Sequence, residues 1–335
     1  MRIVGWGLML FLNRPYLGRS YCLESEMKGA YFEPYLNTEI VMFRMQKPTS
    51  PRFSSVFGFV ILAMSVWIVG CQGQDGGQDV RKTIRFQDVN RFVHVHVPEG
   101  YKPGSKVPLV MAFHGAGDTG GGFQKHSGLD NTADKYGFIV AYPSANGFNW
   151  AEGCNCNRPD LDGVDDIGFT DAVLSTLNES YSIDPNRMFA VGFSQGGLFA
   201  QRVACERSGT YAAFSTVAAM ISEPLSRVCW PAQPVRMMMI NGTSDSILPY
   251  AGIPSGSFAT KSVAETIAMW GDRNECSDQT TTTKIAGNPT YQRDTIGCKQ
   301  GGQVRLIEIV QGQHEWPRGT PDAPKLLMSF FGLSN

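Results

Sequence analysis

The sequence has almost no net charge, because its 29 lysines and arginines nearly balance its 30 aspartates and glutamates. It also has no long run of charges of one sign. Proteins that bind nucleic acid or other polyanions gather basic side chains on one surface, so the sequence argues against such partners. The phosphate-binding pattern G-x-x-x-x-G-K-[ST] is missing as well. We therefore expect no nucleic-acid partner. We also expect no cofactor and no metal.

Long apolar runs are scarce, and the one at residues 56–70 carries no charge. It follows a short basic segment at residues 45–52, so residues 45–70 have the order of a bacterial signal peptide and are short for a membrane span. The run ends in Ile-Val-Gly-Cys, which resembles a lipobox, so we expect Cys71 to be lipidated and to become the mature N-terminus. The alternative is a buried or anchoring apolar segment in which the cysteine occurs by chance.

The signal divides the chain into parts. Residues 71–80 are polar and rich in glycine, which is typical of a flexible tether. Residues 1–44 precede the signal, so we expect them to be disordered or a gene-model artefact, with translation starting at Met45 or Met42. Residues 81–335 then form the folded domain of a secreted protein held to the bacterial membrane by its lipid. Eight cysteines also fit an exported protein.

Composition and pattern favour a single α/β domain. Apolar residues make up 42% of the chain and charged residues 18%, as in a globular protein with a substantial core. From residue 107 onward, strands and helices alternate, which favours one doubly wound, mostly parallel sheet with helices on both faces. The expected strands are residues 81–86, 91–97, 107–113, 137–142, 187–191, 212–220, 235–240, 280–285 and 303–310. The expected helices are residues 126–136, 169–181, 197–204, 262–271 and 325–331.

A Gly-Phe-Ser-Gln-Gly segment centred on Ser194 joins the strand at residues 187–191 to the helix at residues 197–204. Strand, G-x-S-x-G and helix is the context of a nucleophile elbow, a strained turn that projects the serine hydroxyl above the sheet. The N–H of the next residue points to the same place. The bare pattern is weak, and its alternative is a serine in a surface turn.

A serine nucleophile needs a base, usually a histidine oriented by a carboxylate. His314 is the only histidine after Ser194, and it follows the strand at residues 303–310. Among the acids between them, Asp245 alone follows a strong strand, at residues 235–240, although an Asx-turn role is the alternative. The order Ser, Asp, His is the one found in α/β-hydrolases. No cysteine occupies a comparable elbow.

The strand at residues 107–113 runs into His114-Gly-Ala-Gly-Asp. A glycine-rich loop in this place can turn a backbone N–H toward the site, as the second oxyanion donor does in serine hydrolases of this architecture. A phosphate-binding loop is the competing interpretation.

Two other groups of side chains could bind metal or transfer protons. His94 and His96 lie on one face of a strand, but no third ligand is near them in sequence, so we favour partly exposed strand histidines. Asp162, Asp165 and Asp166 could serve acid/base chemistry or calcium. Because a helix follows them, we favour N-capping instead.

Residues 83–335 resemble the bacterial polyhydroxybutyrate depolymerase and feruloyl esterase family of α/β-hydrolases, which is related to acetyl xylan esterases. The order and spacing of the matching motifs make the resemblance specific. They are Phe-His-Gly-Ala from Phe113, Val-Asp-Asp-Ile-Gly-Phe from Val164, Gly-Phe-Ser-Gln-Gly-Gly from Gly192, Ala-Cys-Glu from Ala204, Asn-Gly-Thr-Ser-Asp from Asn241 with Leu-Pro-Tyr from Leu248, and Gly-Gln-His-Glu-Trp-Pro from Gly312.

The resemblance implies an α/β-hydrolase fold with Ser194 as nucleophile, Asp245 as acid and His314 as base. It also implies an oxyanion hole formed by the backbone N–H groups of Ala116 and Gln195. The substrate would be an ester, either a hydroxyalkanoate oligomer or a phenolic or acetyl ester of the plant cell wall.

Two positions depart from the family pattern. Asn241 stands where the H-G-T-x-D motif has histidine, and Glu315 stands where His-Thr-Trp-Pro has threonine. Neither change removes a catalytic group, but Glu315 adds a charge beside the base.

We expect His114, Trp150 and Trp316 to line the substrate cleft, although core packing is an equal alternative for the two tryptophans.

Six cysteines remain in the domain after Cys71, and we expect at least two disulfides. The local pairs are Cys205 with Cys229 and Cys276 with Cys298. Cys154 and Cys156 are too close in sequence for an easy mutual bridge. A zinc site is the alternative, but the C-x-C pair lacks a second pair at the spacing of zinc ligands.

Taken together, the sequence predicts a secreted, lipid-anchored serine esterase that works through an acyl-enzyme. The alternatives are an acetyl xylan esterase or a peptidase on the same fold, or an inactive surface-binding lipoprotein.

Overall fold

The computed structural model describes residues 77–285 and 289–334. The predicted signal peptide, Cys71 and residues 1–44 lie outside the described residues. The described strands are β1 (Gln78–Phe86), β2 (Val89–Val97), β3 (Val107–Phe113), β4 (Ile139–Pro143), β5 (Ile183–Phe193), β6 (Ala213–Val217), β7 (Arg236–Gly242), β8 (Thr280–Ile285), β9 (Thr290–Thr295) and β10 (Gln303–Ile309).

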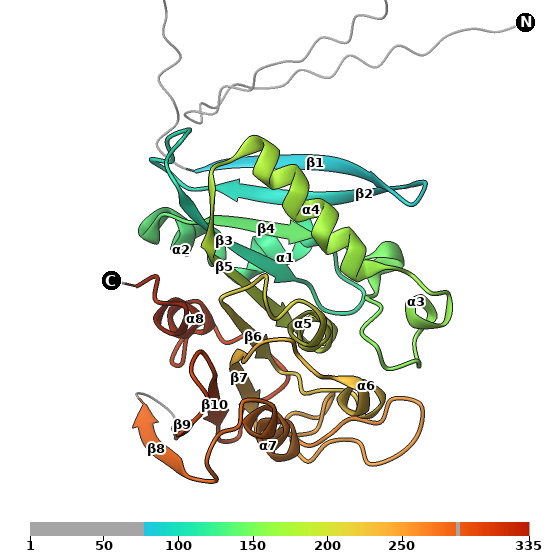
Figure 1. Cartoon of the computed structure of the whole chain (residues 1–335), viewed down its shortest axis with the longest axis vertical. Helices are drawn as coiled ribbons and strands as arrows, with labels where there is room; N and C mark the ends of the chain where they lie inside the picture. The colour runs from blue at the N-terminus through green and yellow to red at the C-terminus, as the bar shows by residue number, and fades with distance from the viewer. Residues whose placement is uncertain (1–76, 286–288, 335) are drawn as a thin grey trace, which may run out of the picture. The chain divides into compact units, whose positions relative to one another are not determined.

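These strands form one ten-stranded sheet in the order β1-β2-β4-β3-β5-β6-β7-β10-β9-β8 (Figure 1). The central strands, from β4 to β10, pair in parallel, whereas β1, β2, β9 and β8 add antiparallel pairs at the two edges. After β3 the chain moves outward to β4 and then returns to place β5 on the other side of β3. In open α/β sheets, ligands bind beyond the carboxyl ends of the strands at such a reversal.

Helices cover both faces of the sheet, as predicted. The described helices are α1 (Gly120–Ser127), α2 (Leu129–Tyr136), the 3₁₀ turn η1 (Asn146–Phe148), α3 (Arg158–Leu161), α4 (Asp166–Ser180), α5 (Gln195–Glu206), α6 (Glu223–Val228), α7 (Val263–Arg273) and α8 (Ala323–Phe331). One apolar cluster joins α4, α5 and α7 to the sheet, and the other joins α1, α2 and α8 to it.

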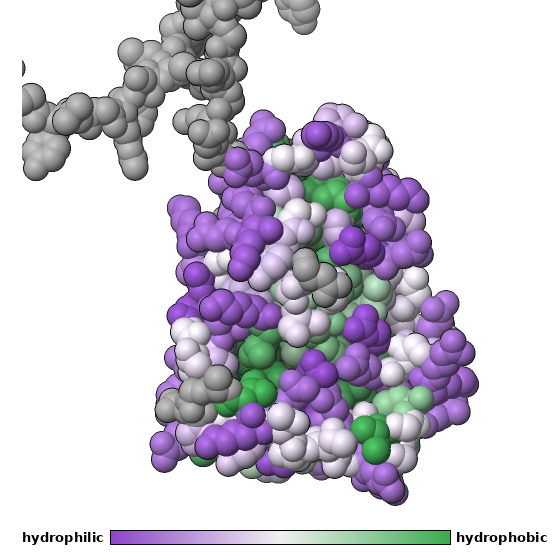
Figure 2. Space-filling view, turned by 90° about the vertical axis from the view of Figure 1, so that its left-hand side faces the viewer, coloured by the Kyte–Doolittle hydropathy of each residue, from purple (hydrophilic) through white to green (hydrophobic). Residues whose placement is uncertain are grey.

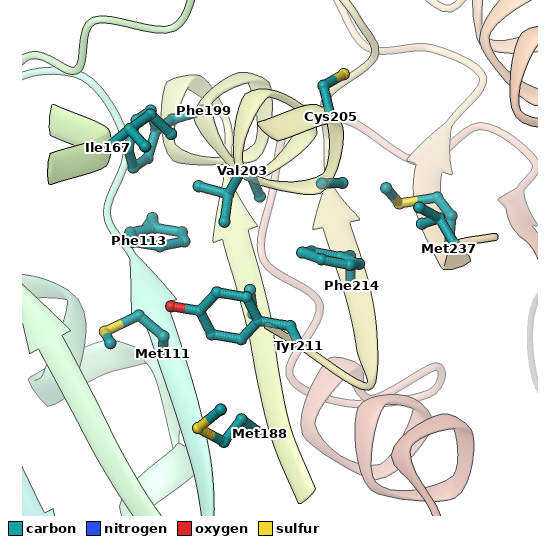
Figure 3. Packing of buried hydrophobic residues seen from close by; sticks show 14 of the residues in the cluster. Met111, Phe113, Ile167, Met188, Phe199, Val203, Cys205, Tyr211, Phe214 and Met237 are labelled. Atoms are coloured by element: carbon teal, nitrogen blue, oxygen red, sulfur yellow. The ribbon is translucent and has the colours of Figure 1, made fainter. Parts of the chain in front are cut away.

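The central strands are buried because helices cover both of their faces. Every residue of β3 is buried, which agrees with its continuous apolar sequence. Figure 3 shows Phe199 and Val203 of α5 packed over Phe113 of β3 and Phe214 of β6. Packing of this kind fixes the start of α5 above the ends of β3 and β5.

Figure 2 shows the molecule from the side of α2 and α8, where polar residues cover most of the surface and apolar ones are visible between them. The apolar residues of α8, including Leu327, Met328 and Phe331, are buried against the sheet. Among the described helices, none has the length and apolar character needed to cross a membrane.

Several element boundaries differ from the prediction, and three of the differences have a clear physical reason. The helix expected at residues 126–136 is two helices, because Gly128 adopts a φ of +71° between α1 and α2. Thr119 starts α1 earlier by accepting the Gly122 N–H at 3.0 Å. At the amino-terminal edge, β1 begins at Gln78 inside the expected tether, because it pairs with β2 from that residue onward.

The strand β9 was not predicted. It forms an antiparallel pair with β8, and β8 consists of exposed residues up to its last position. β9 itself is half-buried along its length after a buried first residue, and its mostly polar sequence lacks the alternation of apolar and polar residues that marks a strand.

The two acidic residues at the start of α4 serve different purposes. Asp165 caps the helix by accepting the Gly168 N–H at 2.7 Å, which confirms the N-capping prediction for this residue. Asp166 is instead fully buried, forms an ion pair with Arg91 at 2.6 Å and accepts the Ala151 N–H at 2.7 Å. It therefore ties β2 and the loop after β4 to α4.

The prediction of partly exposed strand histidines holds for His94 but is wrong for His96, which is buried. The His96 ring nitrogens lie 2.8 Å from Asp79 and 3.0 Å from Asp134, and Asp130 is 3.7 Å away. These acids are distant in sequence, so the pattern around the histidine could not reveal them. Burial opposes protonation, but the three carboxylates outweigh it and raise the pKa of His96.

The structure contains both predicted disulfides, Cys205–Cys229 and Cys276–Cys298. It also contains a bridge between Cys154 and Cys156, and the expectation that these two would not pair is wrong. Gly153 and Asn155 adopt φ values of +87° and +54°, so the chain turns sharply and brings the two Cα atoms within 5.1 Å. The six cysteines are thus paired and offer no thiolate to zinc.

Candidate active site

Ser194 occupies the turn between β5 and α5, with φ +54° and ψ −123°. Few side chains adopt this conformation, and such strain is concentrated at functional sites. The Ser194 N–H donates to the Val217 carbonyl at 2.9 Å, which holds the turn. A Cβ atom at Gly192 would overlap the Gly196 carbonyl, and one at Gly196 would overlap the Phe113 carbonyl. Both glycines are therefore required by close backbone packing.

The structure brings Ser194, His314 and Asp245 into one hydrogen-bonded chain. His314 Nε2 lies 2.8 Å from Ser194 Oγ, and Nδ1 lies 2.8 Å from Asp245 Oδ2. The other Asp245 oxygen accepts the N–H groups of Ile247 and Leu248, each at 2.8 Å. Asp245 thus makes the Asx-type turn that was the alternative and also orients the histidine. With Nδ1–H donating to Asp245, Nε2 is free to accept the serine proton.

The loops that carry the acid and the histidine are bonded to each other. The Thr243 N–H donates to the Ile309 carbonyl, and the Ser244 N–H donates to the Gly312 carbonyl, both at 2.9 Å. A Cβ atom at Gly242 would collide with the Gly312 backbone, so the two loops touch closely at the ends of β7 and β10. The geometry between acid and base is therefore set by the sheet.

Two backbone N–H groups next to Ser194 have no acceptor among the described residues. They belong to Ala116, in the loop after β3, and to Gln195, the first residue of α5. A Cβ atom at Gly115 would lie 3.3 Å from the Ser194 Cβ, so the loop runs directly beside the serine. Free N–H groups at the start of a helix and in a tight loop favour negative charge.

The prediction that His114 lines the substrate cleft is wrong, because its side chain is fully buried. Its Nδ1 donates to the Gly115 carbonyl at 2.8 Å, and its Nε2 accepts the Ala145 N–H at 3.0 Å. Burial lowers the pKa of His114, so the ring is neutral. Because both nitrogens are occupied, the ring fastens the loop after β3 to the loop after β4.

Core packing, the alternative considered for the tryptophans, describes both of them. Trp150 is fully buried, donates its indole N–H to the His114 carbonyl at 2.9 Å and stacks on Phe199 at 4.7 Å. Trp316 is 8% exposed and donates its indole N–H to the Ser127 carbonyl at 2.8 Å. Each tryptophan therefore supports, from the core, the backbone to which its indole N–H donates, at His114 and at Ser127.

Phe148 was missed by the sequence analysis. Its side chain is 56% exposed, its φ is +68°, and its carbonyl accepts the Gly117 N–H at 3.0 Å beside the loop that carries Ala116. A cavity of about 310 Å³ lies next to it, lined among others by Phe92, Thr119 and Ala145. No periodic or motif signal marks this residue. An exposed aromatic ring on a strained backbone, bonded to the loop that carries Ala116, is a candidate substrate contact.

Comparisons with known proteins agree with this architecture. The Esterase family model, described as "Putative esterase", matches residues 88–316. Among curated proteins, "Putative esterase NocK" of Nocardia uniformis subsp. tsuyamanensis is 29% identical over 231 residues, 64% of this chain and 66% of that protein. "Feruloyl esterase B" of Piromyces equi is 25% identical over 238 residues, 67% of this chain and 42% of that protein. The chain thus spans less than two thirds of the length of these relatives.

Solved structures share the fold at low identity. An acetyl xylan esterase from Aspergillus awamori aligns with a TM-score of 0.56 and 16% identity over 76% of this chain and 100% of that one. A ferulic acid esterase from Anaeromyces mucronatus aligns with a TM-score of 0.53 and 15% identity over 79% and 94%. The predicted α/β-hydrolase fold is thereby confirmed. Because the family model extends from the β1–β2 turn to just past His314, this protein belongs to the Esterase family.

Proposed function

We propose that the protein is a serine esterase that hydrolyses carboxylic esters through an acyl-enzyme. The observation that carries the proposal is the continuous hydrogen-bonded chain from Asp245 through His314 to Ser194, next to two unpaired backbone N–H groups. Acyl transfer requires a base for the serine hydroxyl, a carboxylate that orients the base, and hydrogen-bond donors for the oxyanion. This arrangement supplies all three. Membership of the Esterase family supports the same conclusion.

In the first half of the reaction, Ser194 Oγ attacks the ester carbonyl while its proton passes to His314 Nε2. Asp245 stabilises the imidazolium that forms. The carbonyl oxygen becomes an oxyanion between the Ala116 and Gln195 N–H groups, and each such donor contributes roughly 3 kcal/mol in comparable sites. His314 then gives its proton to the departing alcohol, which leaves the acyl group on Ser194.

In the second half, His314 removes a proton from a water molecule, which attacks the acyl carbonyl. A second oxyanion forms between the same two N–H groups. Its collapse returns the proton from His314 to Ser194 Oγ and releases the carboxylic acid. The histidine is thus neutral at the start and at the end of each half.

We propose that the substrate is a phenolic or acetyl ester of the plant cell wall or a hydroxyalkanoate oligomer. The names of the relatives support cell-wall esters, because they include feruloyl and acetylxylan esterases. Phe148 and the cavity beside it supply apolar surface that could receive the non-reacting part of such an ester.

A substrate panel tests this proposal. We expect turnover of p-nitrophenyl acetate and of at least one of methyl ferulate, acetylated xylan and a hydroxybutyrate oligomer, with no cleavage of a peptide amide. The site provides the base and the oxyanion hole that ester cleavage requires, and an ester is cleaved more readily than an amide because an alcohol is a better leaving group than an amine. Cleavage of the amide would favour the peptidase alternative. Inactivity of the wild-type protein on the whole panel would favour the inactive binding lipoprotein.

We also propose that the protein is exported and lipidated at Cys71. The three disulfides support export, because such bonds persist in oxidising compartments. In a bacterium that processes lipoproteins, the wild-type protein should fractionate with membranes and carry a lipid mass on Cys71, and Cys71→Ser should be soluble and unmodified. Soluble, unmodified wild-type protein would contradict this proposal.

A further inference from the structure

Tyr250 is a half-buried tyrosine that takes no part in the proposed reaction. It ends the Leu-Pro-Tyr segment in the loop between β7 and α7, and its hydroxyl donates to Glu308 Oε2 of β10 at 2.8 Å. The ring packs against the apolar cluster that joins α4, α5 and α7 to the sheet. A phenylalanine would serve this packing equally well, so the hydroxyl and its acidic partner need an explanation of their own.

Glu308 interrupts an apolar face of its strand. Residues two apart on a strand share a face, and Val304 and Leu306, which precede Glu308 on this face, are buried in the same apolar cluster. The Glu308 side chain is only 15% exposed. A carboxylate in such a place costs stability unless it is paired. Its partners are Tyr250 on one oxygen and Arg293 of β9, at 2.9 Å, on the other.

The carboxyl group of Glu308 is charged at neutral pH. Burial by itself would raise the pKa of Glu308, but the hydrogen bonds from Arg293 and Tyr250 outweigh this effect and lower that pKa. The Tyr250 hydroxyl keeps its proton, because burial and the bond to the carboxylate raise its pKa. The contact is therefore a phenol donating to a carboxylate, which is one of the stronger kinds of hydrogen bond in proteins.

The Tyr250 hydroxyl connects the loop of the acid to the strand of the histidine. The acid loop, residues 243–252, follows β7 and contains Asp245. Inside it, Asp245 Oδ1 accepts the Leu248 N–H at 2.8 Å, which bonds the carboxylate to the segment that leads to Tyr250. The Tyr250 carbonyl accepts the Val263 N–H of α7 at 3.0 Å, whereas the hydroxyl reaches β10. The backbone and the side chain of this tyrosine thus hold the loop to different elements.

The acid loop is bonded to β10 on both sides of Asp245. Before the acid, the Thr243 N–H donates to the carbonyl of Ile309, the last residue of β10, at 2.9 Å. After it, the bond from Tyr250 to Glu308 is the only hydrogen bond between the loop and β10 that the described residues provide. Because the histidine follows β10, the position of the carboxylate relative to the imidazole depends on both connections.

We infer that Tyr250 is a positioning residue, whose hydrogen bond to Glu308 keeps the acid loop in register with β10. The inference rests on the proposed esterase function. Without the bond, the loop shifts relative to β10, and the Asp245 carboxylate orients the His314 ring less well. A poorly oriented base slows proton transfer from Ser194, so kcat falls while substrate binding is largely kept.

Steady-state kinetics with p-nitrophenyl acetate near neutral pH tests the inference. Tyr250→Phe, which keeps the ring and removes the hydroxyl, should lower kcat about tenfold and leave KM within about twofold. Glu308→Ala removes the same bond from the other side and should have an effect of the same size. In the double variant the two losses should not add, because each substitution breaks the same bond. Glu308→Gln keeps an acceptor for the hydroxyl and should stay within about threefold of wild-type kcat.

The matched control is Tyr291→Phe. Tyr291 lies directly opposite Glu308 in the β9–β10 pair, but its hydroxyl is not among the hydrogen-bond partners of that acid. The substitution therefore removes a tyrosine hydroxyl from the same part of the sheet without touching the acid loop. Both kcat and KM should keep their wild-type values.

Proton NMR tests the inference without turnover. The Nδ1 proton of His314, which lies in the 2.8 Å contact with Asp245, should give a low-field resonance in wild type that is missing from His314→Ala. In Tyr250→Phe this resonance should shift or broaden through faster exchange with water, whereas in Tyr291→Phe it should stay unchanged. A loss of stability alone would leave the resonance in place at temperatures where the variant is folded.

Wild-type kcat in a folded Tyr250→Phe protein would overturn the inference. Additive losses in the double variant, or an unchanged Nδ1 resonance in Tyr250→Phe, would overturn it as well. If Tyr250→Phe does not fold, the same criteria apply to Glu308→Ala. Absence of ester turnover by wild type, together with a changed resonance in Tyr250→Phe, would contradict the proposed function and not the positioning role.

Discussion

Replacing Ser194 by alanine should lower kcat/KM for p-nitrophenyl acetate by about 10⁴-fold or more. The reason is that no other hydroxyl in the described structure lies at hydrogen-bonding distance from His314 Nε2. The alanine variant keeps both proposed oxyanion donors, so a small residual rate over water should remain. Steady-state kinetics near neutral pH, at matched protein concentration, measures the effect.

The matched control for this variant is Ser105→Ala, an exposed serine in the turn before β3. It should keep wild-type kcat and KM, because the change removes a hydroxyl that faces solvent. Circular dichroism and thermal unfolding should show that Ser194→Ala is folded. Full activity in a folded Ser194→Ala protein would show that another residue is the nucleophile.

Replacing Arg91 by methionine should lower the free energy of unfolding by about 3–5 kcal/mol. The Arg91 side chain is 4% exposed and its partner Asp166 is 0% exposed, so the substitution leaves a charge buried without its partner. The guanidinium also stacks on the Phe169 ring at 3.6 Å and donates to the Ser144 carbonyl at 3.1 Å. Urea denaturation at neutral pH measures the loss.

Arg85→Met provides the comparison for the Arg91 variant. Arg85 pairs with Asp88 at 2.9 Å, but the two side chains are 66% and 93% exposed. Water solvates and screens such a pair, so its loss should cost less than about 1 kcal/mol. A similar loss in the free energy of unfolding for the two substitutions would contradict the expectation that a buried ion pair is more costly to break than an exposed one.

The core of the candidate site could be predicted from the sequence because each of its residues follows an apolar strand. Ser194 directly follows β5, while Asp245 and His314 lie in the loops just after β7 and β10, and parallel strands place their carboxyl ends at the same edge of the sheet. Only one histidine follows the serine, so few assignments were possible. The catalytic role itself stays a prediction until activity is measured.

The supporting residues could not be predicted, because their surroundings come from distant parts of the chain. Trp150 is buried by Phe199 of α5, and the ring of His114 is occupied by the Ala145 N–H from the loop after β4. His96 meets Asp134 of α2 only in the folded protein. No spacing in the sequence encodes such contacts.

Local backbone conformation and burial account for the remaining differences between the predicted and the observed structure. The Cys154–Cys156 bridge depends on left-handed backbone at Gly153 and Asn155, which residue types permit but do not require. Glu152 looks in sequence like any polar loop residue, and only its burial in the folded protein distinguishes it. Strained or enclosed residues of this kind become visible when the tertiary structure is known.

The central claim is that ester cleavage passes through an acyl group on Ser194, and mass spectrometry of the enzyme during turnover tests it most directly. Rapid acid quenching of the reaction with p-nitrophenyl acetate should yield protein carrying one acetyl group, located on the peptide that contains Ser194. The adduct should be missing from Ser194→Ala and present in Ser105→Ala. Turnover by wild type with no acyl adduct, or with the adduct on another residue, would contradict the account.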